Sequence, residues 1–353
     1  MPENDLIKPT ARFEDLRGIL RYVPQFRQRV FVIAIDGALL HQPGFPSLLQ
    51  DVAVLQSLNI EVVLVFGARA QIRTLAEKRG VVLSSDDGMG KTDEASLEIA
   101  IEAITRQASE LMADLTALEL PVVISNALVV HPAGVINGTD LEFTGRIERV
   151  DSESLEVILK ADIIPILSPI GYDGKGATLR LNSDAVAIEV ALALKAAKVI
   201  FVSEAGLTNP DGSRLAQISI ADAREIYKRK EARHDVNLLS KLRYGALACQ
   251  EGVARVHIVD GTQDEALLAE LFSNEGVGTM IHADDYQQIR KAQASDVPAL
   301  LSMMQQSMDD AALVPRTREQ IQSRIKDFFV LETDSNPIGC VAVHSYEIGR
   351  AHV

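Results

Sequence analysis

Runs of consecutive apolar residues alternate with amphipathic segments through most of the chain. The first two runs are RVFVIAI (29–35) and EVVLVF (61–66), and a segment with helical spacing at 47–58 separates them. Strands that are apolar throughout are typical of a parallel sheet buried on both faces. Later runs with the same character are LPVVISNALVV (120–130), ADIIPILSPIG (161–171), AKVIFVSEAGLT (197–208) and RVHIVDGT (255–262), the last strand that we predict there.

Further helices are predicted at 92–115 and 184–196, between these strands. The resulting order favours a doubly wound α/β domain over residues 25–282. Ahead of it, Phe13, Leu16, Leu20 and Val23 recur at helical spacing. Residues 1–24 are therefore interpreted as an N-terminal helical segment.

The pattern changes near residue 283. Residues 287–347 predict a strand, a helix capped by Ser295 or Asp296, a second helix, and a hairpin that turns at 334–337. This β-α-α-β-β order then stops, with a sheet that has only begun and whose edge is open. We therefore expect an incomplete second domain.

Composition and charge exclude several functions. The formal net charge of −14 disfavours nucleic-acid binding. Two distant cysteines, Cys249 and Cys340, indicate neither a disulfide framework nor a thiolate zinc site, and the histidines have no metal-binding spacing. No signal peptide or membrane-spanning run is apparent, so we expect a cytoplasmic protein.

The turns after the first two strands lie where α/β domains bind ligands. They resemble the phosphate loops of the amino-acid kinase family, in which a lysine two residues before a Gly-Gly pair neutralises the transferred phosphoryl group. In this chain Ala34 replaces that lysine, and Asp36-Gly37 replaces the Gly-Gly pair. The loop after the second strand is FGARA at 66–70. Asp184 matches a kinase aspartate. These departures from the kinase pattern predict that the domain does not transfer phosphoryl groups.

Five collinear segments resemble bacterial N-acetylglutamate synthases. They are FGARAQI (66–72), FTGRIERVDSESL (143–155), ALLAELFSNEGVGTMI (266–281), QIRKAQASDVPALLSMM (288–304) and LVPRTREQIQSRIKDF (313–328). The chain departs from the family's pattern at Gly90–Asp93 and at Gln25.

The resemblance implies a fold and a reaction. The fold is α/β, an amino-acid-kinase (carbamate-kinase-like) three-layer sandwich followed by a partial acetyltransferase α+β domain of the GNAT type. The reaction transfers acetyl from acetyl-CoA, as co-substrate, to the α-amine of L-glutamate, the first step of arginine biosynthesis. No permanent cofactor and no metal are implied, and a homo-oligomer is expected.

The resemblance also implies two sets of ligand-binding residues. His257, Glu270 and Gly276 match the feedback site for L-arginine, where a carboxylate suits a guanidinium. Alternatively, His257 is a hydrogen-bonded histidine in a strand without a role in ligand binding, and Gly276 only allows a turn. The glutamate site of the family is matched by Leu313 and Arg316, and Arg318 is a nearby candidate. Alternatively, these arginines are solvated charges beside the start of a helix. We find no acetyl-CoA loop after Tyr346, so the catalytic residues stay unassigned.

The last six residues, 348–353, depart from the family pattern. They can be back-translated as ATCGGAAGAGCACACGTC, a common sequencing-adapter sequence, and we interpret them as a non-native tail. Two other functions stay open at this point. One is an acetylglutamate kinase, and the other is an arginine sensor without catalysis.

Overall fold

The computed structural model describes residues 23–24, 26–84, 88–229, 234–273, 276–282, 287–309, 317–333 and 336–343. The chain divides into two compact units, Met1–Ala283 and Asp284–Val353. Of the N-terminal helical segment predicted at 1–24, Val23 and Pro24 are described and helical, and the rest lies outside the described residues.

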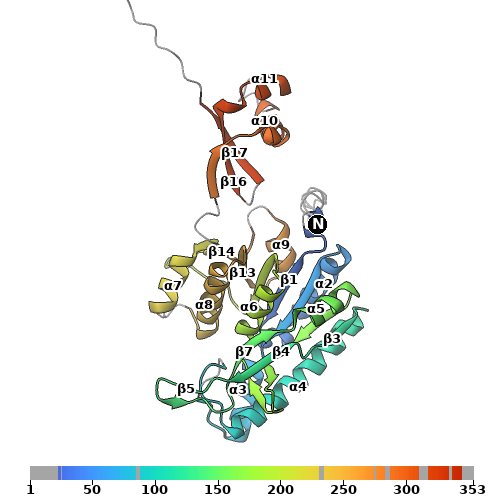
Figure 1. Cartoon of the computed structure of the whole chain (residues 1–353), viewed down its shortest axis with the longest axis vertical. Coiled ribbons are helices and arrows are strands. Elements are labelled where there is room, and N and C mark those ends of the chain that lie inside the picture. Colours follow the sequence, from blue (N-terminus) through green and yellow to red (C-terminus); the bar gives the residue numbers. More distant parts are fainter. Residues whose placement is uncertain are drawn as a thin grey trace, which may run out of the picture. The chain divides into compact units, whose positions relative to one another are not determined.

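An eight-stranded sheet forms the centre of the larger unit (Figure 1), in the order β12-β14-β13-β11-β1-β2-β8-β3. Every pairing is parallel except that of β13 with β14, so the predicted mainly parallel sheet is confirmed. The strands are β1 (Val30–Ile35), β2 (Glu61–Phe66), β3 (Val122–Ile124), β8 (Ile164–Leu167), β11 (Lys198–Ser203), β12 (Gln217–Ser219), β13 (Arg255–Asp260) and β14 (Thr279–His282). The prediction that β13 is the last strand is wrong, because β14 follows it.

Two apolar runs predicted as single strands each divide between two sheets. After β3 the chain leaves the main sheet through Ser125–Ala127, and after β8 it leaves at Pro169, which has no N–H to continue a ladder. The second halves join a sheet of order β10-β9-β4-β7. Its strands are β4 (Leu128–Pro132), β7 (Gly145–Val150), β9 (Ile170–Tyr172) and β10 (Thr178–Arg180), and a separate ribbon pairs β5 (Val135–Ile136) with β6 (Thr139–Asp140).

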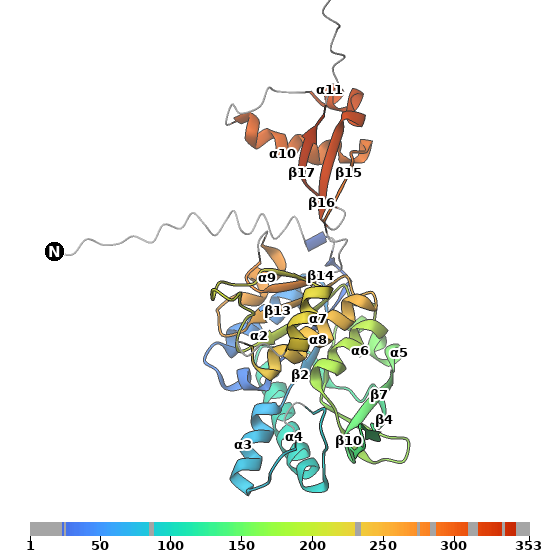
Figure 2. The same ribbon diagram turned by 90° about the vertical axis from the view of Figure 1, so that its left-hand side faces the viewer.

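Helices cover both faces of the main sheet (Figure 2). One face packs against α2 (Phe45–Ser57), α3 (Arg69–Arg79), α4 (Glu94–Ala117) and α9 (Ala266–Phe272). The other packs against α5 (Ser152–Lys160), α6 (Ser183–Ala193), α7 (Ile220–Arg229) and α8 (Val236–Gln250). Side chains of Asp93, Asp151, Asn182 and Asp235 accept hydrogen bonds from the first turns of α4, α5, α6 and α8, which explains where these helices begin.

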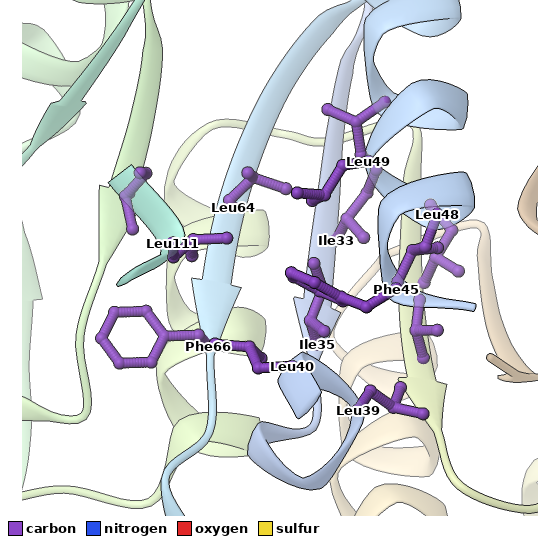
Figure 3. Close-up of a cluster of buried hydrophobic side chains, with 14 of the residues drawn as sticks. Ile33, Ile35, Leu39, Leu40, Phe45, Leu48, Leu49, Leu64, Phe66 and Leu111 are labelled. Carbon is purple, nitrogen blue, oxygen red and sulfur yellow. The ribbon is translucent and has the colours of Figure 1, made fainter. Parts of the chain in front are cut away.

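Alternate residues of β1 belong to two different cores. Ile33 and Ile35 pack with Leu64 of β2 and with α2 (Figure 3), whereas Val32 and Ala34 face α6 and α8. The short helix η1 (Gly37–His41) adds two leucines to the first core. A strand with two buried faces therefore has only its ends available for ligands.

The smaller unit contains an antiparallel sheet of order β15-β16-β17. Its elements are β15 (Gln287–Lys291), η2 (Ala294–Asp296), α10 (Val297–Asp309), α11 (Arg318–Ser323), η3 (Ile325–Asp327), β16 (Phe328–Thr333) and β17 (Asn336–Ala342). The predicted hairpin is confirmed, but Asn336 and Pro337, which the sequence predicts in its turn, already pair with β16 as the start of β17. Asp296, which directly precedes α10, closes a capping box with Gln293 at η2 and pairs with Arg290. In the described parts of both units, no helix is long and apolar enough to cross a membrane.

Replacing Leu64, a fully buried residue of β2, with alanine should lower the free energy of unfolding by about 3 kcal/mol, because the cavity is lined by rigid neighbours. Val82→Ala is the matched control, since that valine is 87% exposed and should change stability by less than about 0.5 kcal/mol. Chemical denaturation followed by circular dichroism measures both. Equal losses in the two variants would contradict the assigned core.

Candidate functional site

The turns that follow β1 and β2 lie directly against each other. Gly67 N donates to Ile35 O over 2.8 Å, and the side chain of Gln71 donates to Gly37 O over 2.7 Å. A Cβ on Gly37 would lie only 2.3 Å from Gly67 O. Glycine is therefore required at 37 by close backbone approach.

A buried lysine occupies the carboxyl end of β1. Lys241 of α8 places its Nζ 2.7 Å from Asp36 Oδ1 and 3.1 Å from Asp184 Oδ1, and the lysine side chain is only 1% exposed. Asn237 donates to the other oxygen of Asp36, and Ser240 donates to Asp184 Oδ2 over 2.6 Å. We call Asp36, Asp184 and Lys241 the ion cluster.

The ion cluster holds two carboxylates and one ammonium. Burial raises the pKa of Asp36, and the nearby Lys241 opposes that rise. Burial by itself would lower the pKa of Lys241, but Asp184 and Asp36 together raise it above its ordinary value. The lysine is thus permanently charged and already neutralised, which leaves it little attraction for a phosphate. Sequence reasoning identified both aspartates but missed Lys241, which lies in an unremarkable helical segment.

A cavity of about 370 Å³ opens over the ion cluster. Its walls include the turns at Gly37 and Gly67 and the first turn of α3. The ionisable residues lining it include Asp36, Arg69, Arg73, Arg180, Asp184 and His234. The cavity therefore lies at the carboxyl ends of β1 and β2, where the sequence predicts ligand turns.

The residues predicted for arginine binding come together elsewhere in the larger unit. His257 of β13 places Nδ1 2.6 Å from Glu270 Oε1 of α9, and both side chains are buried. The other oxygen of Glu270 accepts the backbone N–H groups of Val277 and Gly278, each over 2.7 Å. We call His257, Glu270 and the backbone at 276–278 the His–Glu site.

Lys198, at the start of β11, extends this network. Its Nζ lies 3.4 Å from His257 Nε2 and 5.2 Å from the ring centre of Phe26. Burial, followed by the charge of Lys198, lowers the pKa of His257 to about 4, so the imidazole is neutral at physiological pH. With Nδ1–H donating to the carboxylate, Nε2 accepts from Lys198. The sequence contains one clue to Lys198, a charge inside an otherwise apolar strand.

Position 276, beside Glu270, requires glycine for a steric reason. Its φ of +61° is left-handed, and a Cβ there would lie 2.5 Å from Glu270 Oε2. Arg214 donates to the carbonyl oxygens of Gly276 and Gly278, over 2.9 and 3.1 Å, and holds the loop from outside.

The predicted glutamate-binding residues are only partly described. Leu313 and Arg316 lie outside the described residues. Arg318 is the first residue of α11 and is exposed, directly after the cap Thr317. Across the described ranges, no group of three or more His, Cys, Asp or Glu side chains could hold a metal ion.

Comparison with known proteins identifies both the fold and the family. A model of the amino acid kinase family matches residues 29–260. Carbamate kinase from Giardia lamblia is similar in fold alone, with a TM-score of 0.53 and 12% identity over 72% of this chain and 99% of that one. The amino-acid acetyltransferases of Shewanella oneidensis and Vibrio cholerae are each 33% identical, over 98% and 96% of this chain respectively and 80% of their own lengths.

Two solved structures of N-acetylglutamate synthase from Neisseria gonorrhoeae are 30% identical to this chain. The complex with coenzyme A and L-arginine has a TM-score of 0.86 over 95% of this chain and 80% of that one. The complex with coenzyme A and N-acetyl-glutamate has a TM-score of 0.73, over 96% and 79%.

The fold is therefore a carbamate-kinase-like three-layer sandwich followed by acetyltransferase-type α+β structure, as the sequence predicts. The chain belongs to the amino-acid acetyltransferase family, whose members are acyltransferases.

Replacing Lys241 with methionine should lower the free energy of unfolding by about 3–5 kcal/mol at neutral pH, because two buried carboxylates lose their cation. Without the lysine, the already raised pKa of Asp36 rises further. A raised folded-state pKa favours folding at low pH, so the deficit should shrink as pH falls.

Denaturant titrations at several pH values test this, with Lys160→Met as the control. Lys160 pairs with Glu156 on the surface at 3.2 Å and should have no measurable effect. A Lys241→Met deficit independent of pH would argue against the ion cluster as its cause.

Proposed function

We propose that the protein transfers the acetyl group of acetyl-CoA to the α-amine of L-glutamate, as in arginine biosynthesis, and that L-arginine regulates it through the His–Glu site. The observation that carries the first part is the relationship to acetyltransferases along nearly the whole chain. The Neisseria complex that contains coenzyme A and N-acetyl-glutamate supports the choice of substrate.

The proposed reaction is a direct transfer. The neutral amine of glutamate attacks the thioester carbon of acetyl-CoA, a C–N bond forms, and the C–S bond breaks. The CoA sulfur leaves as a thiolate, and the nitrogen gives up a proton to solvent or a base. Glutamate brings two carboxylates, which require cationic donors, and Arg316 and Arg318 are our candidates for them.

Phosphoryl transfer is the less favoured function for the larger unit. A kinase needs a cation placed to neutralise the charge that develops on the transferred phosphoryl group. Lys241 is held instead between Asp36 and Asp184, and the strand position of the expected lysine is the buried Ala34. The carboxylate of Asp36 also adds negative charge where a phosphate would lie.

The His–Glu site suits a guanidinium ligand. A carboxylate offers about four lone-pair positions, and Glu270 uses three of them for His257, Val277 and Gly278. One position is left for the ligand. Lys198 provides a cation nearby that could pair with the ligand's own carboxylate. Pairing with these two buried charges would favour arginine over neutral amino acids.

The protein incubated with acetyl-CoA and L-glutamate should release CoA thiol and form N-acetylglutamate, measured by a thiol reagent and by mass spectrometry. Arg318→Gln should raise the KM for glutamate about tenfold, since it loses one charged hydrogen bond, and leave the KM for acetyl-CoA unchanged.

Arg324→Gln is the matched control, an exposed arginine at the other end of α11. Formation of ADP from ATP and acetylglutamate would instead indicate a kinase. Thermal stabilisation by arginine with no thiol release would indicate a sensor, and either outcome would refute the proposed acetyl transfer.

Glu270→Gln should abolish the rise in melting temperature that L-arginine causes in the unmodified protein, because the amide loses the charge that pairs with guanidinium. Gly276→Ala should act similarly through the contact of its Cβ with Glu270. Glu265→Gln, an exposed neighbour before α9, is the control and should keep the full response. A normal arginine response in Glu270→Gln would place the effector elsewhere.

A further inference from the structure

The polar backbone groups of the loop at 276–278 have two sets of partners. The N–H groups of Val277 and Gly278 both donate to Oε2 of the buried Glu270, each over 2.7 Å. The carbonyl oxygens of Gly276 and Gly278 accept hydrogen bonds from Nη1 of the exposed Arg214, over 2.9 and 3.1 Å. The loop is therefore held between a buried glutamate and a surface arginine.

The peptide group between Gly276 and Val277 explains how the outer contact affects the inner one. The C=O and N–H groups of a trans peptide lie in one plane and point in opposite directions. Arg214 binds the carbonyl oxygen of this peptide, and Glu270 accepts from its N–H. Because the peptide is rigid, a contact that fixes the oxygen also directs the N–H group toward Glu270.

Two of the three residues in this loop are glycines, which makes a single conformation costly to maintain. Gly276 has a φ of +61°, which glycine adopts about as readily as a negative φ. Fixing such residues loses more backbone entropy than fixing any other residue type. A contact from outside the loop is therefore needed to offset that loss, and Arg214 makes two of them.

Arg214 suits this role because its own backbone lies in a hydrogen-bonded hairpin. It forms an antiparallel bridge with Thr208, and Asn209 N donates to Ser213 O over 2.8 Å. The side chain of Asn209 also donates to Arg214 O over 3.2 Å. With the backbone already ordered, the contact to the loop costs only the side-chain torsions of Arg214.

We propose that Arg214 is a positioning residue for the His–Glu site, which holds the 276–278 loop in its ligand-binding conformation and thereby sets the affinity for L-arginine. This role rests on the proposed binding of L-arginine at that site. Both loop N–H groups bind Glu270 Oε2, and His257 binds Oε1. The lone-pair position left for a guanidinium then lies on Oε1.

Hydrogen exchange of the full chain without ligand tests the hold on the loop. In Arg214→Met, the amides of Val277 and Gly278 should exchange about tenfold faster than in the unmodified protein, because charged hydrogen bonds to the loop are lost. Arg214→Lys should restore slow exchange, since one ammonium nitrogen can donate to both carbonyl oxygens, as Nη1 does. Arg106→Met, at an exposed position of α4, is the matched control and should change neither amide.

Isothermal titration with L-arginine tests the effect on affinity. Arg214→Met should raise the Kd about tenfold, whereas Arg214→Lys and Arg106→Met should keep the Kd of the unmodified protein.

Unchanged exchange of both amides in Arg214→Met would overturn the proposal, as would faster exchange with an unchanged Kd. Failure of Arg214→Lys to restore slow exchange would overturn it as well. If the unmodified protein binds no arginine, the effector role of the site is refuted, and with it the effect on affinity. The exchange rates still decide whether Arg214 holds the loop, so the two failures are distinguishable.

Discussion

Burial of the parallel sheet on both faces is the constraint on which the rest of the larger unit depends. Ile33 and Val32 are adjacent in sequence, yet they pack into separate cores against different helices. In β1 and β2 the residues between the strand ends are accordingly all apolar. Asp36 and the Gly67 turn lie at the carboxyl ends of the parallel strands. Lys198 lies at their amino end and belongs to the same network as Glu270.

Lys241 and Glu270 are buried charges with partners at opposite ends of the strands. The partner of each determines which ligand charge it can still attract. Lys241 could neutralise a phosphate if it were uncommitted, but two carboxylates hold it. In the His–Glu site, His257 is neutral and directs its proton to Glu270, which keeps the carboxylate charged. In this kinase-like fold, the pairing of Lys241 leaves it less available to a phosphate.

Much of this could be predicted from particular residues. The unbroken apolar runs predict β1 and β2, and Ala34 and Asp36 already indicate a failed kinase site. The strand breaks at Ser125–Ala127 and Pro169 were missed, because apolar character continues across them while the chain moves to another sheet. Lys241 and Lys198 were missed as well. Only its three-dimensional neighbours distinguish Lys241 from an ordinary lysine, whereas the apolar strand around Lys198 was a clue that was not used.

The sequence by itself determined the class of fold, the family and the positions of the ligand turns, because hydrophobic periodicity and motif spacing are local properties of the chain. Tertiary structure alone decided which charges meet. Lys241 is more than two hundred residues from Asp36 in sequence, and their 2.7 Å contact exists only because the folded chain brings the Lys241 side chain of α8 to the end of β1. Pairing of buried charges depends on such long-range packing, and no local pattern encodes it.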